Sequence, residues 1–526
     1  MNYFSRRIII IVILLIISNL IFFSSGTEGE KPLNIIIVWH YHQPCYRDPM
    51  KENFLLMPWV RMHSAKNYYR MAEIISLYPD IHVTFDFSGS LMQQIEDYIK
   101  YNATDLGETL SKTPIENLTL KDKMILLSIP GGMFDINWAR IVTKVPRYNE
   151  LLEKRQKAFK LFDNLPEPER SEKITAYFTN QDYIDLMALF NLHWLDPEYV
   201  KRNSELSPLL EKGYKFEAYT QADINLILEY HRKLLKEIFL TYKKLIEKGQ
   251  VEVVPTPYTH PILPLLADFG WDEDIQLQIQ KGIELFKKYF SVIPKGMWSP
   301  EAAVNEASIL SMAMQGITWT IADETTLMKA GIDTNNKYSL YRPYKIEKDD
   351  KKIIIFFRDS DLSNRISFTY QSWATEKAIA DIEKYLLNIQ KLNKDEWKVL
   401  TIALDGENPW ERYPNNGNDF LHTLYKKLEE LQKQGKVRTL TPSEYLKVYE
   451  PISMKISEQK VLNLKDKDIS LITEYKDLPL TKKLQILPEG SWAGDLATWI
   501  GEKQENIAWM WVAKARQAFN NVKDKL

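Results

Sequence analysis

Seven short apolar segments, rich in the β-branched and aromatic residues that favour strands, alternate mainly with helical patterns along this chain. They are Asn34–Trp39, Ile81–Phe87, Val251–Pro255, Lys295–Trp298, Ile317–Ala322, Ile353–Phe357 and Val399–Leu404. Between them, apolar residues recur with helical spacing, for example over Ile224–Lys248. Strands that alternate with helices favour a parallel sheet over a sandwich. The chain is therefore predicted to form an irregular parallel (β/α)7 barrel of the α/β class.

Two segments depart from this alternation. Residues from about 104 to 223 contain helical patterns at Leu151–Phe162 and Asp182–Leu192, and we interpret them as a helical insertion in one barrel loop. A long insertion of this kind is commonly functional, so we expect a lid or a binding wall. The barrel with its insertion covers residues 31–435. Residues 436–526 are predicted to be a mainly helical C-terminal region that completes the cleft.

The first 30 residues have the pattern of an export signal. Arg6 and Arg7 precede the apolar segment Ile8–Phe23, and small residues follow at Ser24–Gly26. This order is typical of a secretory signal peptide. The apolar segment is shorter than the about 20 residues that span a membrane, and an uncleaved N-terminal anchor is the second interpretation. We therefore expect an extracellular protein, either secreted or attached to the cell surface, with membrane contact only through an uncleaved anchor.

Composition excludes some partners and sites. With 68 Lys and Arg against 70 Asp and Glu, the formal net charge of -2 argues against a nucleic-acid partner. The single cysteine, Cys45, excludes an intramolecular disulfide framework and a zinc cluster built from cysteines. Aromatic residues make up 12% of the chain, which suits a large core and also stacking against sugar faces. Its richness in Lys, Glu and Ile suits a heat-stable protein.

Polar side chains stand at the ends of most predicted strands. They are His40, His42, Glu252, Glu301, Asp323, Asp359, Asp361 and Asp405. Because the carboxyl ends of parallel strands share one rim, these groups are expected to converge. Glycoside hydrolysis needs two carboxyl groups that flank the sugar C1. Glu301 and Asp405 fit this need, since two nearby carboxyl groups also raise the pKa of one of them and so supply a protonated acid.

The loop after Asp405 has a simpler alternative interpretation. An Asp-Gly turn followed by a solvated acidic segment would explain Asp405, Gly406 and Glu407. It would not explain Asn408 and Trp410, which add nothing to a simple turn.

Four motifs occur in a fixed order along the chain. They are His40–Pro44 (HYHQP), Gly249–Glu252 (GQVE), Trp298–Glu301 (WSPE) and Asp405–Asn408 (DGEN). In this order they resemble the characteristic regions of glycoside hydrolase family 57, which includes α-amylases, amylopullulanases, 4-α-glucanotransferases and branching enzymes. The similarity covers about Leu33 to Ala515 and is strongest to the amylopullulanase branch. The resemblance implies a seven-stranded (β/α) barrel with a helical C-terminal region.

The resemblance also implies roles for individual residues. It implies that Glu301 is the nucleophile and Asp405 the general acid/base of a retaining mechanism, with carboxyl groups about 5–5.5 Å apart. The residues expected to bind substrate are His40, His42, Gln43, Glu252, His260, Trp298, Asp359, Glu407, Trp410 and Trp492. The histidines would orient sugar hydroxyls and the tryptophans would stack on sugar faces. His260 is equally compatible with a structural role, and Glu407 with capping its loop.

The function expected from the resemblance is an exported enzyme that cleaves α-1,4 bonds in starch-like glucans through a glycosyl-enzyme intermediate. Cleavage of α-1,6 bonds stays open, and so does 4-α-glucanotransfer, which uses the same intermediate. A non-catalytic glucan-binding protein is a further alternative. The presence of both Glu301 and Asp405 argues against it.

A metal-dependent hydrolase similar to polysaccharide deacetylases is the remaining alternative. In it, His40, His42 and an aspartate would hold a metal, since imidazole is a common metal ligand. No third ligand is evident beside this pair, and no contiguous EF-hand-type loop is present. We therefore predict an α-glucan as partner and no required metal or cofactor.

Overall fold

The structure is a computed structural model that describes residues 30–334, 337–348, 350–393, 396–448, 482–483 and 487–523. The predicted export signal lies outside these ranges, as does much of the predicted C-terminal helical region. Among the described helices, none combines the length and apolar character needed to cross a membrane.

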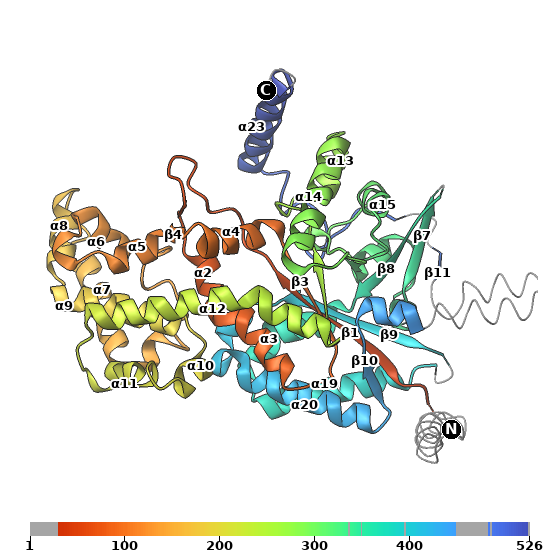
Figure 1. The fold of residues 1–526 in the computed structure, drawn as a ribbon, viewed down its shortest axis with the longest axis horizontal. Coiled ribbons are helices and arrows are strands. Elements are labelled where there is room, and N and C mark those ends of the chain that lie inside the picture. Colours follow the sequence, from red (N-terminus) through yellow and green to blue (C-terminus); the bar gives the residue numbers. More distant parts are fainter. Residues whose placement is uncertain are drawn as a thin grey trace, which may run out of the picture.

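A mainly parallel sheet at the centre of the molecule organises the chain (Figure 1). Its strands are β1 (Leu33–Tyr41), β3 (Val83–Phe87), β5 (Val251–Pro255), β6 (Trp319–Asp323), β8 (Lys351–Arg358) and β9 (Lys398–Asp405). β9, β1, β3 and β5 are parallel neighbours in that order, and β6 pairs with β8. β8 meets β9 through one pair, Arg358 and Thr401.

The predicted fourth strand closes the ring as a short bridge rather than a full strand. Trp298 donates its backbone N–H to Pro255 over 3.0 Å, Met297 donates to Trp319 over 3.2 Å, and Gly296 forms a parallel bridge with Trp319. A Cβ at Gly296 would overlap the ring of Trp319, so glycine permits this close approach. All seven predicted strand positions therefore surround one axis, which confirms the irregular (β/α)7 barrel.

The two faces of the strands bury different cores. Ile36, Val38, Val254, Trp319 and Phe356 belong to the cluster that fills the barrel interior. Alternate residues, such as Ile35, Ile37 and Val253, pack outward against the helices. His40 pairs in register with both Asp86 and Asp405 at the carboxyl ends of β3 and β9. The chain therefore gathers these three polar residues on one rim.

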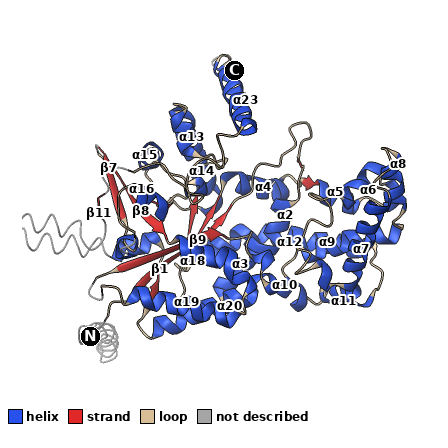
Figure 2. Cartoon of the chain, turned by 180° about the vertical axis from the view of Figure 1, so that it is seen from behind, coloured by secondary structure: helices blue, strands red, loops and turns tan. Residues whose placement is uncertain are grey.

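Helices cover the outside of the barrel (Figure 2). They include α2 (Trp59–His63), α3 (Tyr69–Ser76), α4 (Gly89–Lys100), α13 (Leu263–Asp268), α14 (Asp272–Phe290), α15 (Glu306–Met314), α16 (Glu324–Lys329), α17 (Lys337–Leu340), α18 (Ser360–Asn364), α19 (Thr375–Gln390) and α20 (Asn418–Lys433). The apolar stripe of α20, for example, buries Phe420, Leu424, Leu428 and Leu431 at helical spacing.

Some short strands lie outside the predicted seven. β7 (Tyr344–Lys348) runs antiparallel to β8, and β10 (Val437–Thr439) adds to β1. β2 (Phe54–Leu55) pairs with β4 (Thr104–Asp105), and β11 (Lys482–Lys483) pairs with β7.

The insertion forms a helical body at one end of the molecule (Figure 1). Its helices are α5 (Leu106–Lys112), α6 (Leu120–Leu127), α7 (Pro146–Leu161), α8 (Glu169–Ala176), α9 (Asn180–His193), α10 (Pro197–Arg202) and α11 (Ser207–Lys215). They enclose a hydrophobic core of their own. The long α12 (Gln221–Glu247) joins both parts, because Ile224 and Leu228 pack in the insertion core while Ile238 and Leu245 pack against the barrel.

The C-terminal segment returns to the rim before it ends in α23 (Lys503–Asn520). Gly490 forms an antiparallel bridge with Val304, which brings Trp492 to the barrel opening. Trp509 of α23 packs against Phe269 and Trp271.

Candidate active site

A cleft of about 430 Å³ opens at the carboxyl ends of the barrel strands. Its lining comprises His40, His42, Glu301, Arg358, Asn364, Ser367, Phe368, Leu404, Asp405, Glu407, Asn408, Pro409, Arg412 and Trp492. The cleft therefore brings together both predicted catalytic carboxyl groups and four of the predicted substrate-binding residues.

Glu301 stands on a strained turn just after the bridge that closes the barrel. Its φ is 57° and that of Ala302 is 48°, in the left-handed region that costs about 1–2 kcal/mol for a residue with a side chain. The indole Nε1 of Trp492 donates to Glu301 Oε2 over 2.8 Å, and His260 Nδ1 lies 4.0 Å from Oε1. Burial raises the pKa of Glu301, while the charge of His40 and this hydrogen bond oppose that rise.

Asp405 ends β9 and is oriented by its own loop. Asn408 Nδ2 donates to Asp405 Oδ2 over 2.8 Å. Gly406 donates its N–H to the carbonyl of His40 over 2.8 Å, and a Cβ on Gly406 would overlap the ring of Tyr41. Glycine at position 406 therefore allows β9 and β1 to approach each other closely. The carboxyl group of Asp405 lines the cleft beside this contact.

His40 is the positively charged histidine of the site. Its Nδ1 lies 2.7 Å from Asp86 Oδ1, and both side chains are buried. Burial alone would lower the pKa of His40, but the charge of Asp86, the hydrogen bond to it, and the charges of Asp405 and Glu407 raise that pKa to about 9. His40 is therefore an imidazolium at neutral pH, held beside the carboxyl groups.

His42 and His260 are neutral partners of that cation. Their rings stack with centroids 3.8 Å apart, and His42 Nδ1 lies 2.9 Å from Ser88 Oγ. Burial and the charge of His40 lower the pKa of His42 to about 3, and burial lowers that of His260 well below its usual value. Neutral imidazoles both donate and accept hydrogen bonds, which suits contact with hydroxyl groups.

Glu407 lies beneath Asp405 as a buried carboxyl group. Its Oε1 accepts from the Tyr68 hydroxyl over 3.1 Å and from the His42 N–H over 3.3 Å. Burial, and next the charge of Asp405, raise the pKa of Glu407 well above its usual range. Gln43 is buried behind it, with its Nε2 3.5 Å from Glu407 Oε1 and 3.3 Å from the Tyr68 hydroxyl. Gln43 therefore supports Glu407 rather than lining the cleft.

Two predicted binding residues lie away from the cleft. Glu252 is near the amino end of β5, where Ser443 donates both its hydroxyl and its N–H to the carboxylate, over 2.5 and 3.1 Å. Asp359 caps α18 and accepts hydrogen bonds from the hydroxyls of Tyr341 and Tyr385 over 2.9 and 3.0 Å. Both residues are structural here, which corrects the prediction that they bind substrate.

Two of the three predicted stacking tryptophans are also buried. Trp410 packs on Trp39 and donates its indole N–H to the carbonyl of Gly406 over 2.8 Å. Trp298 lies within the barrel beneath His40, with ring centroids 5.1 Å apart. Both support the site from below, which corrects their predicted role as sugar platforms. Trp492 does line the cleft.

Several residues of the site were not singled out from the sequence, among them Arg358, Asp86 and Phe368. Arg358 donates to Asp323 Oδ2 over 2.9 Å and to the carbonyl of Ala403 over 2.7 Å, and its guanidinium lies 5.7 Å from the ring of Trp492. Asp86 anchors His40, and Phe368 stands exposed at the cleft edge. The isolated charge of Asp86 within an apolar strand was the signal that could have revealed it.

Donor atoms of His40, His260 and Glu301 all lie within 4.8 Å of one another, a spacing compatible with a divalent cation. His40 could ligate a metal through Nε2 only by losing the proton that it holds at neutral pH, because its Nδ1 faces Asp86. The absence of a required metal stays a prediction.

Comparisons with known proteins identify the family. A model of glycosyl hydrolase family 57 matches residues 36–465. A 1,4-alpha-glucan branching enzyme from Thermococcus kodakarensis is 22% identical over 361 residues, covering 60% of this chain and 51% of that enzyme. An alpha-amylase from Pyrococcus horikoshii is 25% identical over 277 residues, covering 50% of this chain and 41% of that protein. The chain thus spans about half the length of these relatives.

The fold of this chain also resembles a solved structure. The branching enzyme from Pyrococcus horikoshii, at 15% identity, has a TM-score of 0.50 over 92% of this chain and 77% of that one. This likeness concerns the fold, while the family model covers the motifs that build the cleft. On that match, the chain belongs to glycosyl hydrolase family 57.

Proposed function

We propose that this chain is a retaining enzyme that cleaves α-1,4 bonds in starch-like glucans. The observation that carries the proposal is that Glu301 and Asp405 line one cleft at the barrel rim. A retaining mechanism needs two such carboxyl groups. The names of the relatives, a branching enzyme and an alpha-amylase, point to the same class of substrate.

In the proposed mechanism, Glu301 attacks the sugar C1 while Asp405 protonates the leaving oxygen. The product is a glycosyl-enzyme intermediate. Asp405 then takes a proton from water or from a sugar hydroxyl, which attacks C1 and releases Glu301. Asn408 orients Asp405 through its hydrogen bond, and Trp492 orients Glu301. The separation of about 5–5.5 Å between the two carboxyl groups stays a prediction.

The product profile on amylose and pullulan tests this proposal, with the anomeric configuration followed by proton NMR. Early α-anomeric maltooligosaccharides from amylose would support a retaining amylase. Maltotriose from pullulan would extend it to α-1,6 cleavage, the amylopullulanase activity. Longer glucans than those supplied would instead indicate 4-α-glucanotransfer. Release from neither glucan would overturn the proposal.

One alternative has a specific observation in its favour. The arrangement of His40, His260 and Glu301 could accommodate a metal, and a deacetylase-like hydrolase would depend on it. Activity that survives dialysis against a chelator supports the glycosidase. Acetate release from an acetylated glycan that chelator abolishes would favour the metal-dependent hydrolase.

We also propose that the protein works outside the cytoplasm. The support is the charged and apolar pattern of residues 1–26, which is typical of an export signal. The N-terminal sequence of protein recovered from the medium and from the membrane fraction distinguishes cleavage from anchoring. Intact protein found in the cytoplasm alone would contradict export.

A further inference from the structure

One wall of the catalytic cleft has no role in the mechanism proposed above. Its residues follow β8 and β9 in the sequence, and they are Asn364, Ser367, Phe368, Pro409 and Arg412. Phe368 is 61% exposed, although burial of an aromatic ring is favourable. Ligand sites are lined mainly by apolar and aromatic side chains with a few polar groups, so an open ring in this cleft indicates a contact surface for a ligand.

The backbone that presents Phe368 is held in place. Phe368 belongs to a π-helical turn, Arg365–Thr369, in which its neighbours Ile366 and Ser367 are buried. The Nε2 of Gln371 donates to the carbonyl of Phe368 over 2.6 Å. π-helical turns are rare and occur frequently at functional sites. The ring of Phe368 therefore projects from an ordered turn whose neighbouring side chains pack inward.

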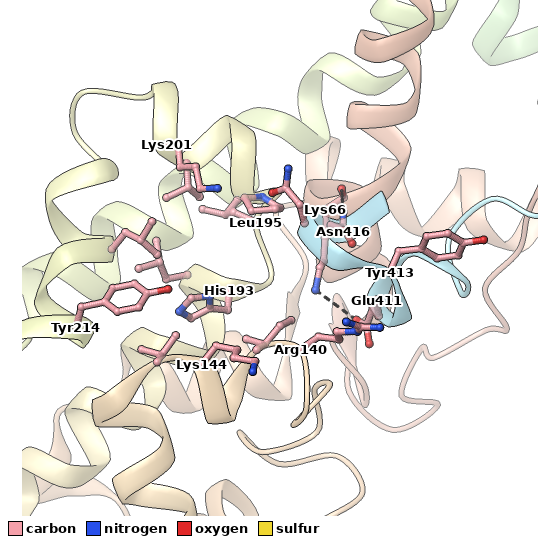
Figure 3. Close-up of a pocket in the computed structure, with 17 residues that line it drawn as sticks. Lys66, Arg140, Lys144, His193, Leu195, Lys201, Tyr214, Glu411, Tyr413 and Asn416 are labelled. Atoms are coloured by element: carbon pink, nitrogen blue, oxygen red, sulfur yellow. Dashed lines mark hydrogen bonds and ion pairs between the residues drawn. The ribbon is translucent and has the colours of Figure 1, made fainter. Parts of the chain in front are cut away.

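The insertion joins this turn to the loop that follows β9. Arg140 donates from Nη2 to the carbonyl of Gln371, just after the turn, over 2.8 Å. It also donates from Nε to the carbonyl of Arg412 over 2.9 Å. Figure 3 shows Arg140 next to Glu411, the residue before Arg412, at the edge where the insertion meets this loop. One guanidinium therefore holds the two segments of the cleft wall together.

Arg412 adds hydrogen-bond donors to this wall. Its side chain is exposed and forms no hydrogen bond or ion pair within the part of the chain that the structure describes. A guanidinium carries five N–H donors and no acceptor. An aromatic face with donors in the same wall matches a sugar ring, which combines C–H faces with hydroxyl oxygens. Glu301 and Asp405 in the same cleft disfavour an anionic ligand, because their negative charges would repel it.

The position of the wall assigns the sugar that it binds. Phe368 and Arg412 follow the neighbouring strands β8 and β9, and β9 also carries Asp405. Glu301 instead follows the bridge between β5 and β6. The proposed acid, Asp405, contacts the oxygen that leaves with the departing sugar. We propose that Phe368 and Arg412 form a subsite for this departing glucose unit, and that an acceptor sugar occupies the same subsite in the second step.

This inference rests on the proposed function, because only an enzyme that forms a glycosyl intermediate on Glu301 has an acceptor. In that intermediate, water and a sugar hydroxyl compete for C1. A sugar bound to Phe368 and Arg412 holds its hydroxyl near C1, which favours its attack over that of water. The subsite therefore raises the ratio of transfer to hydrolysis.

α-Maltosyl fluoride with added maltose tests the subsite, because the fluoride that leaves is not a sugar and leaves the subsite open for maltose. The C1–fluorine bond breaks as Glu301 bonds to C1, and fluoride departs with the proton of Asp405. Water or a maltose hydroxyl then bonds to C1, passes its proton to Asp405 and releases Glu301. Chromatography of the products measures the ratio of transfer to hydrolysis.

Phe368→Ala should lower this ratio roughly 3- to 10-fold at subsaturating maltose, the usual effect of losing one aromatic contact. Arg412→Met removes the donors, keeps an unbranched side chain and should lower the ratio as well. Phe368→Tyr keeps the ring and should keep the ratio. A purely structural role for Phe368 would lower both products together and leave the ratio unchanged.

Phe519→Ala is the matched control, at a phenylalanine on α23 that is 57% exposed and outside the cleft lining. It should keep the ratio of the wild type. An unchanged ratio in Phe368→Ala would overturn this inference, while fluoride release by the wild type would still support the proposed function. A wild type that releases no fluoride would overturn both. An equal fall of the ratio in Phe519→Ala would also overturn the inference, because the effect would not be local to the cleft.

Discussion

Trp492 donates its indole N–H to Glu301 Oε2 over 2.8 Å, although the two residues lie 191 positions apart in the sequence. The backbone of the same two residues is also joined, since Trp492 N donates to the Glu301 carbonyl over 3.2 Å. The C-terminal segment therefore holds the carboxyl group of Glu301, which stands on a strained turn of the barrel rim. Because Trp492 lines the cleft together with barrel residues, the site is built from the C-terminal segment as well as from the barrel.

Replacing Trp492 by Phe removes this donor and keeps an aromatic ring. A hydrogen bond to a charged group contributes about 1.5–3 kcal/mol, so kcat/KM should fall roughly 10- to 100-fold. The bond also lowers the pKa of Glu301, and its loss should move the acidic limb of the pH–rate profile to higher pH. Trp499→Phe, at a half-buried tryptophan outside the cleft lining, is the control. An unchanged acidic limb in the Trp492 variant would contradict the assignment.

The roles of the two carboxyl groups can be separated by azide rescue with substrates that carry a good leaving group. In Glu301→Ala, azide replaces the nucleophile and should give the β-glycosyl azide. In Asp405→Ala, azide attacks the glycosyl-enzyme in place of water and should give the α-glycosyl azide. Without azide, loss of the general acid/base should lower turnover of unactivated glucans by about 10²- to 10⁴-fold. The opposite pair of products would exchange the two roles.

Asp86→Asn tests the ion pair that keeps His40 protonated at neutral pH. Removing one partner of a buried pair costs about 3–5 kcal/mol. The pKa of His40 is raised from 6.5 in the unfolded chain to about 9 in the folded protein. The ion pair therefore stabilises the fold fully below pH 6.5, and this stabilisation is lost as the pH rises through about 9. Urea unfolding should therefore show a larger loss at pH 6.5 than at pH 10.

The control for that variant is Asp97→Asn. Asp97 pairs with Arg47, whose side chain is 39% exposed, so its loss should cost about 0–1 kcal/mol at either pH. In an NMR titration of Asp86→Asn, the pKa of His40 should fall from about 9, because burial is then opposed only by the weaker effects of Asp405 and Glu407. A pKa of His40 that stays near 9 would mean that Asp405 and Glu407 hold the proton instead.

The barrel could be predicted because its strands carry long runs of β-branched residues whose meaning does not depend on distant contacts. The site was harder, because adjacent strand residues face opposite sides. Arg358 and Asp359 are neighbours at the end of β8, yet Arg358 faces the cleft and Asp359 faces the helices. Glu252 faces the same side of β5 as Val254 but lies two residues nearer the amino end of the strand, where the Ser443 hydroxyl donates a hydrogen bond to it. Sequence composition at a strand end does not fix either choice.

The same limit applies to the aromatic residues. Trp410 and Trp492 stand in similar polar, glycine-containing loops, but Trp410 is sealed beneath the rim by Trp39 and Gly417. The fourth strand was predicted from Lys295–Trp298, yet its length depends on how closely Gly296 approaches Trp319. These outcomes depend on packing between segments far apart in the chain, which local patterns do not contain.

Glu407→Gln tests whether the carboxyl group beneath Asp405 is neutral. Because its pKa is raised well above the usual range, Glu407 ionises at a higher pH in the folded protein than in the unfolded chain, where it ionises above about pH 4.3. The wild type therefore loses about 1.4 kcal/mol of stability per pH unit from that side chain between its unfolded and folded pKa values. Glutamine cannot ionise, so the variant should be more stable relative to the wild type at pH 8 than at pH 4.

Urea unfolding at the two pH values measures this difference. Glu376→Gln, at an exposed carboxylate on α19, is the control and should give the same small change at both. If Glu407→Gln is instead more destabilising at pH 8 than at pH 4, Glu407 is ionised in the folded protein. Its negative charge would then lie beside that of Asp405, which would make Glu407 an electrostatic partner in catalysis rather than a buried support.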